Sequence, residues 1–296
     1  MERFLECVLF VAGVAFGSFL NVCISRIPRD ESVVAPRSHC PTCNAPVRWY
    51  DNLPVASWLV LRGRCRDCGG RIPWRYPAVE LLTGILFAAC YAWFGLTWLT
   101  LKFCVFSFLI VGLIFMDAET GLLPREFTYP GIGLGLAFAW IAPADSTGTQ
   151  FLLSVYNAHV ESVQRLSLLD SALAAAVGAG FLYVAWGLYY LVRKKHGLGF
   201  GDIALMAMSG AFLGLRLTLF VIFTAPLLGV LFAILLVARE AVGSNSSARL
   251  EGEENAHAVG AFLSREIPFG VFLGTCSLAA MFFGQSAWEW YLGRFR

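Results

Sequence analysis

Two aspartates stand at the edges of long apolar runs, where carboxylates are unusual. Asp117 ends the run GLIFMD, and Asp202 begins the run DIALM directly after the glycine-rich GLGFG. If the two runs pack together, the two carboxylates face one another. A close pair cannot easily ionise twice, so one group keeps its proton while the other acts as a base. The pair predicts activation of a water for attack on a peptide carbonyl, with a single coupled titration.

Simpler roles compete for the residues around Asp202. Aspartate is a favoured N-cap and suits the positive end of a helix dipole. That role does not explain Asp117, whose charge at a helix C-terminus is disfavoured. A phosphate-binding loop normally follows a strand, and the context here is helical. We interpret Gly199 and Gly201 as backbone clearance for an extended peptide, with close helix packing as the lesser explanation.

Three further acidic residues lie at or near apolar runs. Glu6 and Glu289 are near the outer ends and are expected to reach water. Glu80 lies one turn into the segment RYPAVELLTG. It is expected either to pair with Arg75 or to line a substrate pocket, because carboxylates within a membrane span are costly and tend to be functional.

Four cysteines form two CxxC pairs, Cys40 with Cys43 and Cys65 with Cys68, separated by 21 residues. Two such knuckles at this spacing are typical of a tetrahedral zinc site. The alternative is two disulfides or four free thiols, but disulfides rarely persist in the cytoplasm. Four protein ligands leave no open position, so the predicted zinc is structural. The other five cysteines lie in apolar runs and are expected to act as small hydrophobes.

The composition places these residues in a membrane protein. Hydrophobic residues make up 58% of the 296-residue chain, charged residues only 14%, and the mean hydropathy is +0.67. Several runs approach the roughly 20 apolar residues that cross a bilayer. We therefore predict an all-α polytopic membrane protein with about eight transmembrane helices, although 203–238 could be one span or two. The predicted spans are 7–25, 77–95, 98–116, 127–143, 171–192, 203–216, 218–238 and 267–285.

The polar segment 26–76 separates the first span from the others. It holds nine arginines and four acidic residues, a net charge of +5. The positive-inside rule puts it in the cytoplasm, and headgroup contact explains the arginines better than nucleic-acid binding. The same alternation puts 117–126 and 193–202 in the cytoplasm and 144–170 outside. The predicted domains are a first helix at 1–25, a four-cysteine zinc-binding domain at 26–76 and a membrane peptidase domain at 77–292. Segment 240–266 is expected to be a flexible cytoplasmic loop.

Together these motifs resemble those of the type IV prepilin leader peptidases, which are membrane aspartic proteases with a GxGD signature. The resemblance covers nearly the whole chain. Its motifs are GSFLNVCISRIP at 17–28, the two CxxC pairs, RYPAVELLTG at 75–84, DxxxxxLP at 117–124, GLGFGD at 197–202 and IPFG at 267–270.

The resemblance implies an enzyme of the bacterial inner membrane that removes the leader of prepilins and pseudopilins at the cytoplasmic face. It makes Asp117 and Asp202 the catalytic pair. It also implies N-methylation of the new terminus with S-adenosylmethionine, because members with the cysteine loop are usually bifunctional. The residues that bind the methyl donor are left unassigned, with Glu80 as a candidate. Two positions depart from the family: Ala204 replaces a usual lysine, and Val271 replaces a frequent proline after IPFG.

Two other classes of protein fit parts of the pattern. An ion or proton transporter could use both aspartates, but transporters usually show repeats with broken helices at the midplane. A non-enzymatic scaffold could use the zinc domain for docking. The sequence leaves the particular substrate undetermined among pilus, secretion and uptake machineries.

Overall fold

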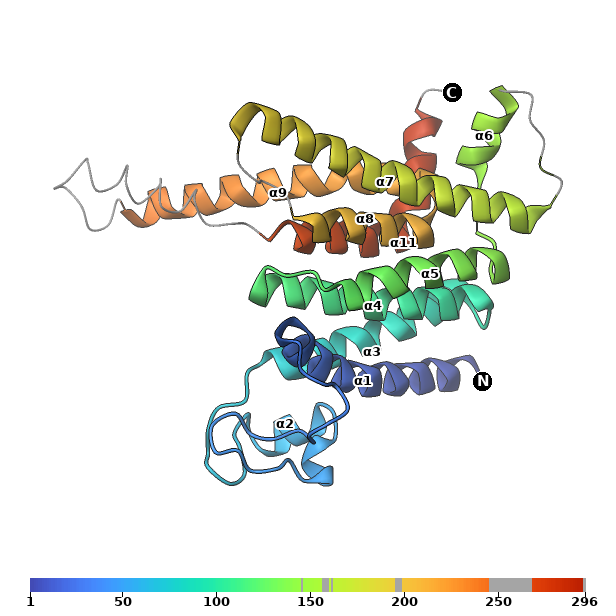
Figure 1. Cartoon of the computed structure of the whole chain (residues 1–296). Coiled ribbons are helices and arrows are strands. Elements are labelled where there is room, and N and C mark those ends of the chain that lie inside the picture. Colours follow the sequence, from blue (N-terminus) through green and yellow to red (C-terminus); the bar gives the residue numbers. More distant parts are fainter. Residues whose placement is uncertain (145, 156–159, 161, 195–198, 245–267, 295–296) are drawn as a thin grey trace.

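The computed structural model describes residues 1–144, 146–155, 160, 162–194, 199–244 and 268–294. These residues contain helices and short turns and no strands. Figure 1 shows the long helices lying side by side in a bundle, with the segment around α2 outside it. The long helices are α1 (Glu2–Arg26), α3 (Arg75–Phe94), α4 (Trp98–Thr120), α5 (Arg125–Ile141), α7 (Val163–Arg193), α8 (Phe200–Leu213), α9 (Leu215–Ser244) and α11 (Phe269–Gly293). The shorter ones are α2 (Ala56–Val60), α6 (Thr147–Val155) and the 3-10 turns η1 (Ile27–Arg29) and η2 (Trp49–Asn52).

Each of the eight predicted spans coincides with one long helix. Six of these helices are long and apolar enough to cross a membrane by length and composition. The two others are shorter, since α5 has 17 residues and α8 has 14. The predicted helical membrane protein is confirmed. The predicted flexible loop at 240–266 falls almost entirely outside the described residues, and α9 continues to Ser244.

The stretch 203–238 forms two helices, and the break between α8 and α9 falls at Gly214. This residue has a φ of +80°, which favours glycine. The buried Asp170 of α7 holds the break, because its Oδ2 accepts a hydrogen bond from the Leu215 N–H at 3.1 Å. Its Oδ1 accepts from Thr149 Oγ1 of α6 at 2.6 Å. The carboxylate thus ties three segments together at this end of the bundle.

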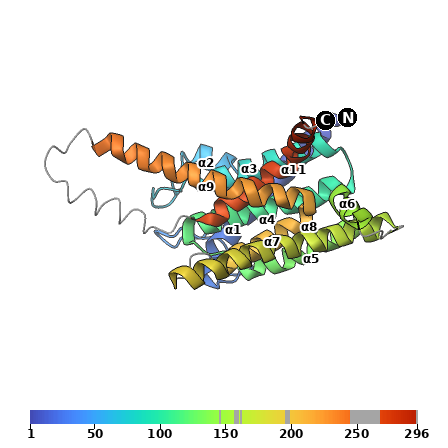
Figure 2. The same cartoon turned by 90° about the horizontal axis from the view of Figure 1, so that it is seen from above.

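The two ends of the bundle carry different segments. The N-terminus and α6 lie at one end, on the right in Figure 1, and α2 lies toward the other. Figure 2, seen from above, shows the N-terminus and α6 at the same end. Segments predicted to share a membrane side, such as the N-terminus and 144–170, therefore share an end of the structure.

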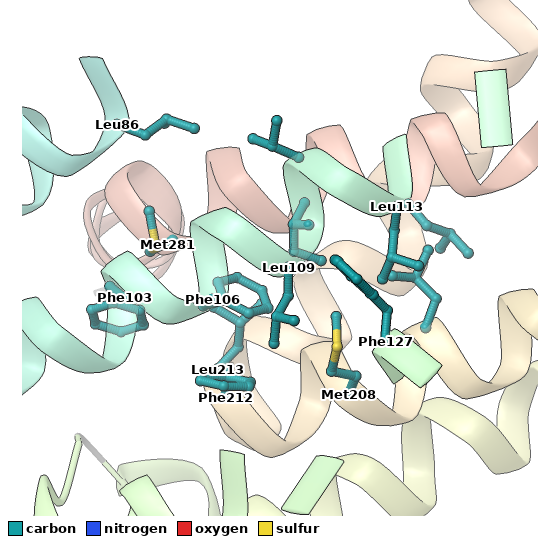
Figure 3. Packing of buried hydrophobic residues seen from close by; sticks show 14 of the residues in the cluster. Leu86, Phe103, Phe106, Leu109, Leu113, Phe127, Met208, Phe212, Leu213 and Met281 are labelled. Carbon is teal, nitrogen blue, oxygen red and sulfur yellow. The ribbon is translucent and has the colours of Figure 1, made fainter. Parts of the chain in front are cut away.

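Helix α4 lies at the centre and contacts α1, α3, α5, α8 and α11. Its core side chains are large and apolar, and Figure 3 shows them meeting residues of α5 and α8. The rings of Phe106 and Phe212 stack with centroids 5.0 Å apart, and Met208 of α8 is fully buried beside them. This packing places the last turn of α4 and the first turn of α8 in one neighbourhood.

Candidate active site and metal centre

Asp117 lies in the last turn of α4, and its side chain is buried, with the residue 6% exposed. Its Oδ2 accepts a hydrogen bond from the backbone N–H of Val271 at 3.0 Å. Val271 belongs to the first turn of α11, where backbone N–H groups have no helical partner. The N-terminus of α11 therefore stabilises the charge of Asp117, which lies unfavourably at the C-terminus of α4.

Asp202 is the third residue of α8 and is 8% exposed. The N-cap is Gly199, and Asp202 Oδ2 accepts a hydrogen bond from the Gly199 N–H at 3.2 Å. The aspartate is thus not the N-cap itself, although it does bond to the helix start. Its other oxygen, Oδ1, is buried and has no hydrogen-bond partner among the described residues. That oxygen is open to a further donor.

Leu123 packs against two glycines, each of which adjoins one of the aspartates. A Cβ added to Gly201, next to Asp202, would be 2.6 Å from Leu123 Cβ. A Cβ added to Gly270 would be 3.0 Å from Leu123 Cδ1 and 2.8 Å from Asp117 Oδ2. Leu123 and its two glycine neighbours therefore place the two aspartates in one neighbourhood.

The glycines of GLGFGD have different surroundings. Gly201 packs against Leu123 of the same chain, so its lack of a side chain serves internal packing. Gly199 has a φ of −78°, and a Cβ there would meet Asp202 Oδ2 at 3.4 Å, an ordinary contact. Gly199 contributes its N–H, which any residue but proline supplies. Close packing, the lesser explanation at the sequence level, accounts for Gly201.

Three residues of this site carried no assigned role in the sequence analysis: Leu123, Gly270 and Val271. The first two belong to the LP and IPFG motifs, so the signal was present without a function attached. Val271 contributes its backbone N–H, a group whose role cannot be read from the residue type. A proline at this position would have no N–H to donate.

Glu80 lies apart from the aspartates, on a cavity between the cysteine domain and the start of α3. Its carboxylate accepts a hydrogen bond from the Val55 N–H at 2.7 Å. Arg75 pairs with Glu119 of α4 and donates to Ser25, so the expected pairing of Arg75 with Glu80 is wrong. The other expectation agrees with the structure, because Glu80 lines the cavity. Neither Glu6 nor Glu289 lines it.

This cavity has a volume of about 510 Å³, within the range of small-molecule sites. Asn21 Oδ1 and Arg75 Nε, both from lining residues, are buried without a hydrogen-bond partner among the described residues. The cavity also reaches Glu119 and Thr120 at the end of α4. It can therefore hold a polar ligand close to the helix that carries Asp117.

The four predicted cysteines meet outside the bundle. The Sγ atoms of Cys40, Cys43, Cys65 and Cys68 all lie within 4.8 Å of one another. Cys40 Sγ and Cys68 Sγ are 3.8 Å apart, far beyond a disulfide bond. A tetrahedron with Zn–S bonds of about 2.3 Å has edges of roughly 3.8 Å. The cluster could hold a metal ion, and the disulfide alternative does not fit.

Each knuckle is a tight turn closed by backbone hydrogen bonds. The Cys40 N–H donates to Ala45 O at 2.9 Å and the Cys65 N–H to Gly70 O at 2.7 Å. Backbone N–H groups of Cys43 and Thr42 lower the pKa of the Cys40 thiol to about 6, which favours the metal-binding thiolate. Arg66 forms a double hydrogen bond to Asp51 of η2, at 2.6 and 2.9 Å. This bond lowers the pKa of Asp51 and ties the second knuckle to η2.

The fold and the site define a helical membrane protein with a buried pair of carboxylates and a separate four-cysteine domain. Two family models match the chain. Residues 11–94 match the bacterial peptidase A24 N-terminal domain, and residues 103–234 match the type IV leader peptidase family. Asp117 and Asp202 lie inside the second match, whereas Val271 lies beyond it.

Relatives named prepilin leader peptidase/N-methyltransferase are similar over much of the chain. The protein of Aeromonas hydrophila is 32% identical over 97% of this chain and 94% of its own length. That of Myxococcus xanthus is 41% identical over 77% of this chain, a match that spans 62% of the relative. That of Neisseria gonorrhoeae is 34% identical over 76% of this chain and 80% of its own length. No solved structure matches the chain. The chain belongs to the type IV leader peptidase family.

Proposed function

We propose that this protein cleaves the leader peptide of type IV prepilins or pseudopilins and methylates the new N-terminus. The observation that supports cleavage is that Asp117 and Asp202 are both buried, at helix ends that meet around Leu123. Family membership supports the same reaction. The alternatives, a transporter and a scaffold, have no comparable support.

Cleavage uses the two aspartates as base and acid. The ionised carboxylate takes a proton from a water held between the pair, and the hydroxide attacks the peptide carbonyl carbon. The protonated carboxyl gives its proton to the leaving amine as the C–N bond breaks. The Val271 and Gly199 N–H groups each occupy one oxygen of an aspartate, and Asp202 Oδ1 is open for the water.

Methylation is assigned to the cavity beside Glu80. S-adenosylmethionine, when bound, supplies an electrophilic methyl group for an amine. The unpartnered Asn21 Oδ1 and Arg75 Nε are an acceptor and a donor suited to a zwitterionic ligand. The Glu80 carboxylate adds a negative charge toward a cation or an amine. These residues would hold the methyl donor.

We assign a structural zinc ion to Cys40, Cys43, Cys65 and Cys68. The thiol geometry fits tetrahedral coordination, and four protein ligands leave no position for catalysis. We keep domain boundaries at 26–76 and 77–292 as a proposal; α1 ends at Arg26 and α3 begins at Arg75, within two residues of them. The positive segment 26–76 faces the cytoplasm of the inner membrane by the positive-inside rule, and the carboxylates face the same side.

The test is mass spectrometry of a candidate prepilin co-expressed with the protein. The expected product has lost its leader and gained one methyl group at the new N-terminus. Asp117→Asn and Asp202→Asn are expected to abolish cleavage, a loss of at least about a thousandfold, with unchanged protein levels. Glu6→Gln, at an acidic residue remote from the pair, is the control. Retained cleavage in either aspartate variant contradicts the role of that residue.

A second variant separates the two activities. Glu80→Gln keeps the size of the side chain but removes its charge. We expect methylation to fall at least about tenfold while leader removal stays within about threefold. Equal losses of both activities would contradict a separate methyl-donor cavity.

A further inference from the structure

A second hollow lies where α1 leaves the bundle. It has a volume of about 340 Å³ and runs between the end of α1 and the segments 33–38 and 47–52. Its lining includes Phe19, Val22, Val34, Trp49, Arg26 and Arg37. It adjoins the cavity beside Glu80, and five lining residues border both: Val22, Arg26, Ser38, Val47 and Asn52.

The walls of this groove are apolar and exposed. Phe19 on α1 is 49% exposed, Trp49 is 81% exposed and Val34 is 86% exposed. Phe19 lies within a membrane-spanning helix, but Val34 and Trp49 belong to the polar cysteine domain. Side chains of this kind are stabilised when water is removed from their surface. Tryptophan is also enriched at the membrane–water boundary.

The charge of the groove is entirely positive. Arg26 and Arg37 line it, and no aspartate or glutamate is among its lining residues. Arg26 is buried, and its guanidinium donates to Ser32 O and Pro36 O at 2.8 and 2.7 Å, which fixes its charge in the wall. The Arg37 side chain is exposed and pairs with no carboxylate in the described part of the chain.

The position of the groove along α1 favours a ligand with one charged end and one apolar end. Arg26 is the last residue of α1. The two arginines are therefore expected at the boundary between the hydrocarbon core of the membrane and the lipid headgroups. Phe19 lies two turns deeper, on the lipid side. Basic pockets at the ends of membrane helices are suited to anionic lipid headgroups. We propose that this groove binds an anionic phospholipid, with its phosphate at Arg37 and Arg26 and an acyl chain along Phe19 and Val22.

The test measures lipid binding to the full chain in detergent by native mass spectrometry. The probes are phosphatidylglycerol, phosphatidylcholine and inorganic phosphate. We expect phosphatidylglycerol to bind at least tenfold more tightly than phosphatidylcholine. Arg37→Gln should remove most of that difference, and Trp49→Ala should weaken both lipids. Arg64→Gln, at an exposed arginine of the same domain outside the groove, is the matched control and should change the affinity less than twofold.

Three results would overturn the proposal. Equal affinity for the two lipids would remove the role of the charge. An equal effect of Arg64→Gln and Arg37→Gln would indicate diffuse attraction rather than a site. Competition by inorganic phosphate as strong as by phosphatidylglycerol would indicate a phosphate site without a lipid. Metal content and leader cleavage of each variant report that it has folded.

Discussion

The cysteine domain and the carboxylate pair are built in opposite ways. The cysteine cluster forms within a short stretch, from two turns whose ligands are three residues apart in the chain. The carboxylate pair is assembled from the ends of α4, α8 and α11, and the hydrogen bond from Val271 to Asp117 joins residues 154 positions apart. The cysteine cluster depends on local turns, and the carboxylate pair depends on helix packing.

This difference predicts which changes disrupt each region. A metal site of this kind loses its order when its ligands are removed, because metal binding supplies the folding energy of a small domain. The carboxylate pair needs no such ion, but it is sensitive to shifts of an ångström in the packing of helix ends. Substitutions in one region should therefore leave the other largely intact.

The largest expected effect is removal of the metal. Replacing Cys40 and Cys43 together by serine is expected to abolish zinc binding, which is worth about 10–16 kcal/mol in comparable sites. Leader cleavage should fall less than about tenfold, whereas methylation should fall further because the domain forms one wall of the cavity. Metal analysis and mass spectrometry of the prepilin measure these effects.

Cys7→Ser, outside the knuckles, is the control for that experiment. Complete loss of cleavage in a double variant that still inserts and accumulates would show that the two regions are not independent.

The next effect concerns the packing around Leu123. Gly201→Ala is expected to displace Leu123, since the new Cβ would lie 2.6 Å from its Cβ. A displacement near 1 Å at a reacting group costs about a hundredfold in rate. Gly199→Ala, in the same loop, should cost less than about threefold because its Cβ has ordinary contacts. Cleavage rates compare the two, and equal rates would contradict the packing role of Gly201.

A smaller effect tests the backbone donor to Asp117. Val271→Pro removes the N–H without breaking α11, because proline is tolerated in the first turn of a helix. A hydrogen bond to a charged group is worth about 1.5–3 kcal/mol. Because a proline is frequent at this position in the family, we expect a loss of at most about tenfold in kcat, with a changed pH–rate profile.

Val271→Ala keeps the N–H and should stay near the wild-type rate. If the alanine and proline variants are equally slow, the side chain rather than the hydrogen bond matters.

The smallest effect lies at the surface of the cysteine domain. Asp51→Asn removes the ion pair with Arg66, and chelator-driven zinc release should become about twofold faster at neutral pH, as befits an exposed pair. The pair lowers the pKa of Asp51, so its stabilisation is present at neutral pH and is lost as the pH falls through the folded pKa. The difference between variant and wild type should therefore vanish in acid.

Hydropathy predicted the positions of the long helices, but their ends depend on polar residues. Helix α7 begins at Val163, eight residues before the predicted start, because Ser162 caps it by accepting from the Arg165 N–H. The first turn contains the polar residues Gln164 and Arg165, which lower the local hydropathy and so hide the start of the helix. The short helix α6 was not predicted, since nine residues give little periodic signal.

The four cysteines and the two aspartates could be proposed as site residues from the sequence because their residue types carry the chemistry. Their surroundings could not, because the partners are backbone groups or apolar side chains. The Val271 and Gly199 N–H groups exist at almost any residue, and Leu123 is one of many leucines. Only the packing of three helix ends shows which of them touch the carboxylates.

The hydrogen bond between Asp117 and Val271 also bears on biosynthesis. Its donor lies in α11, 154 residues after Asp117, so this part of the site cannot form until α11 has been made. Long-range contacts of this kind form late. A chain ended before Phe269 should insert its earlier helices and bind zinc without cleaving prepilins, which expression of such a fragment would measure. Proteolytic activity would then be acquired only after α11 has been made, and a copy without α11 could not cleave prepilins.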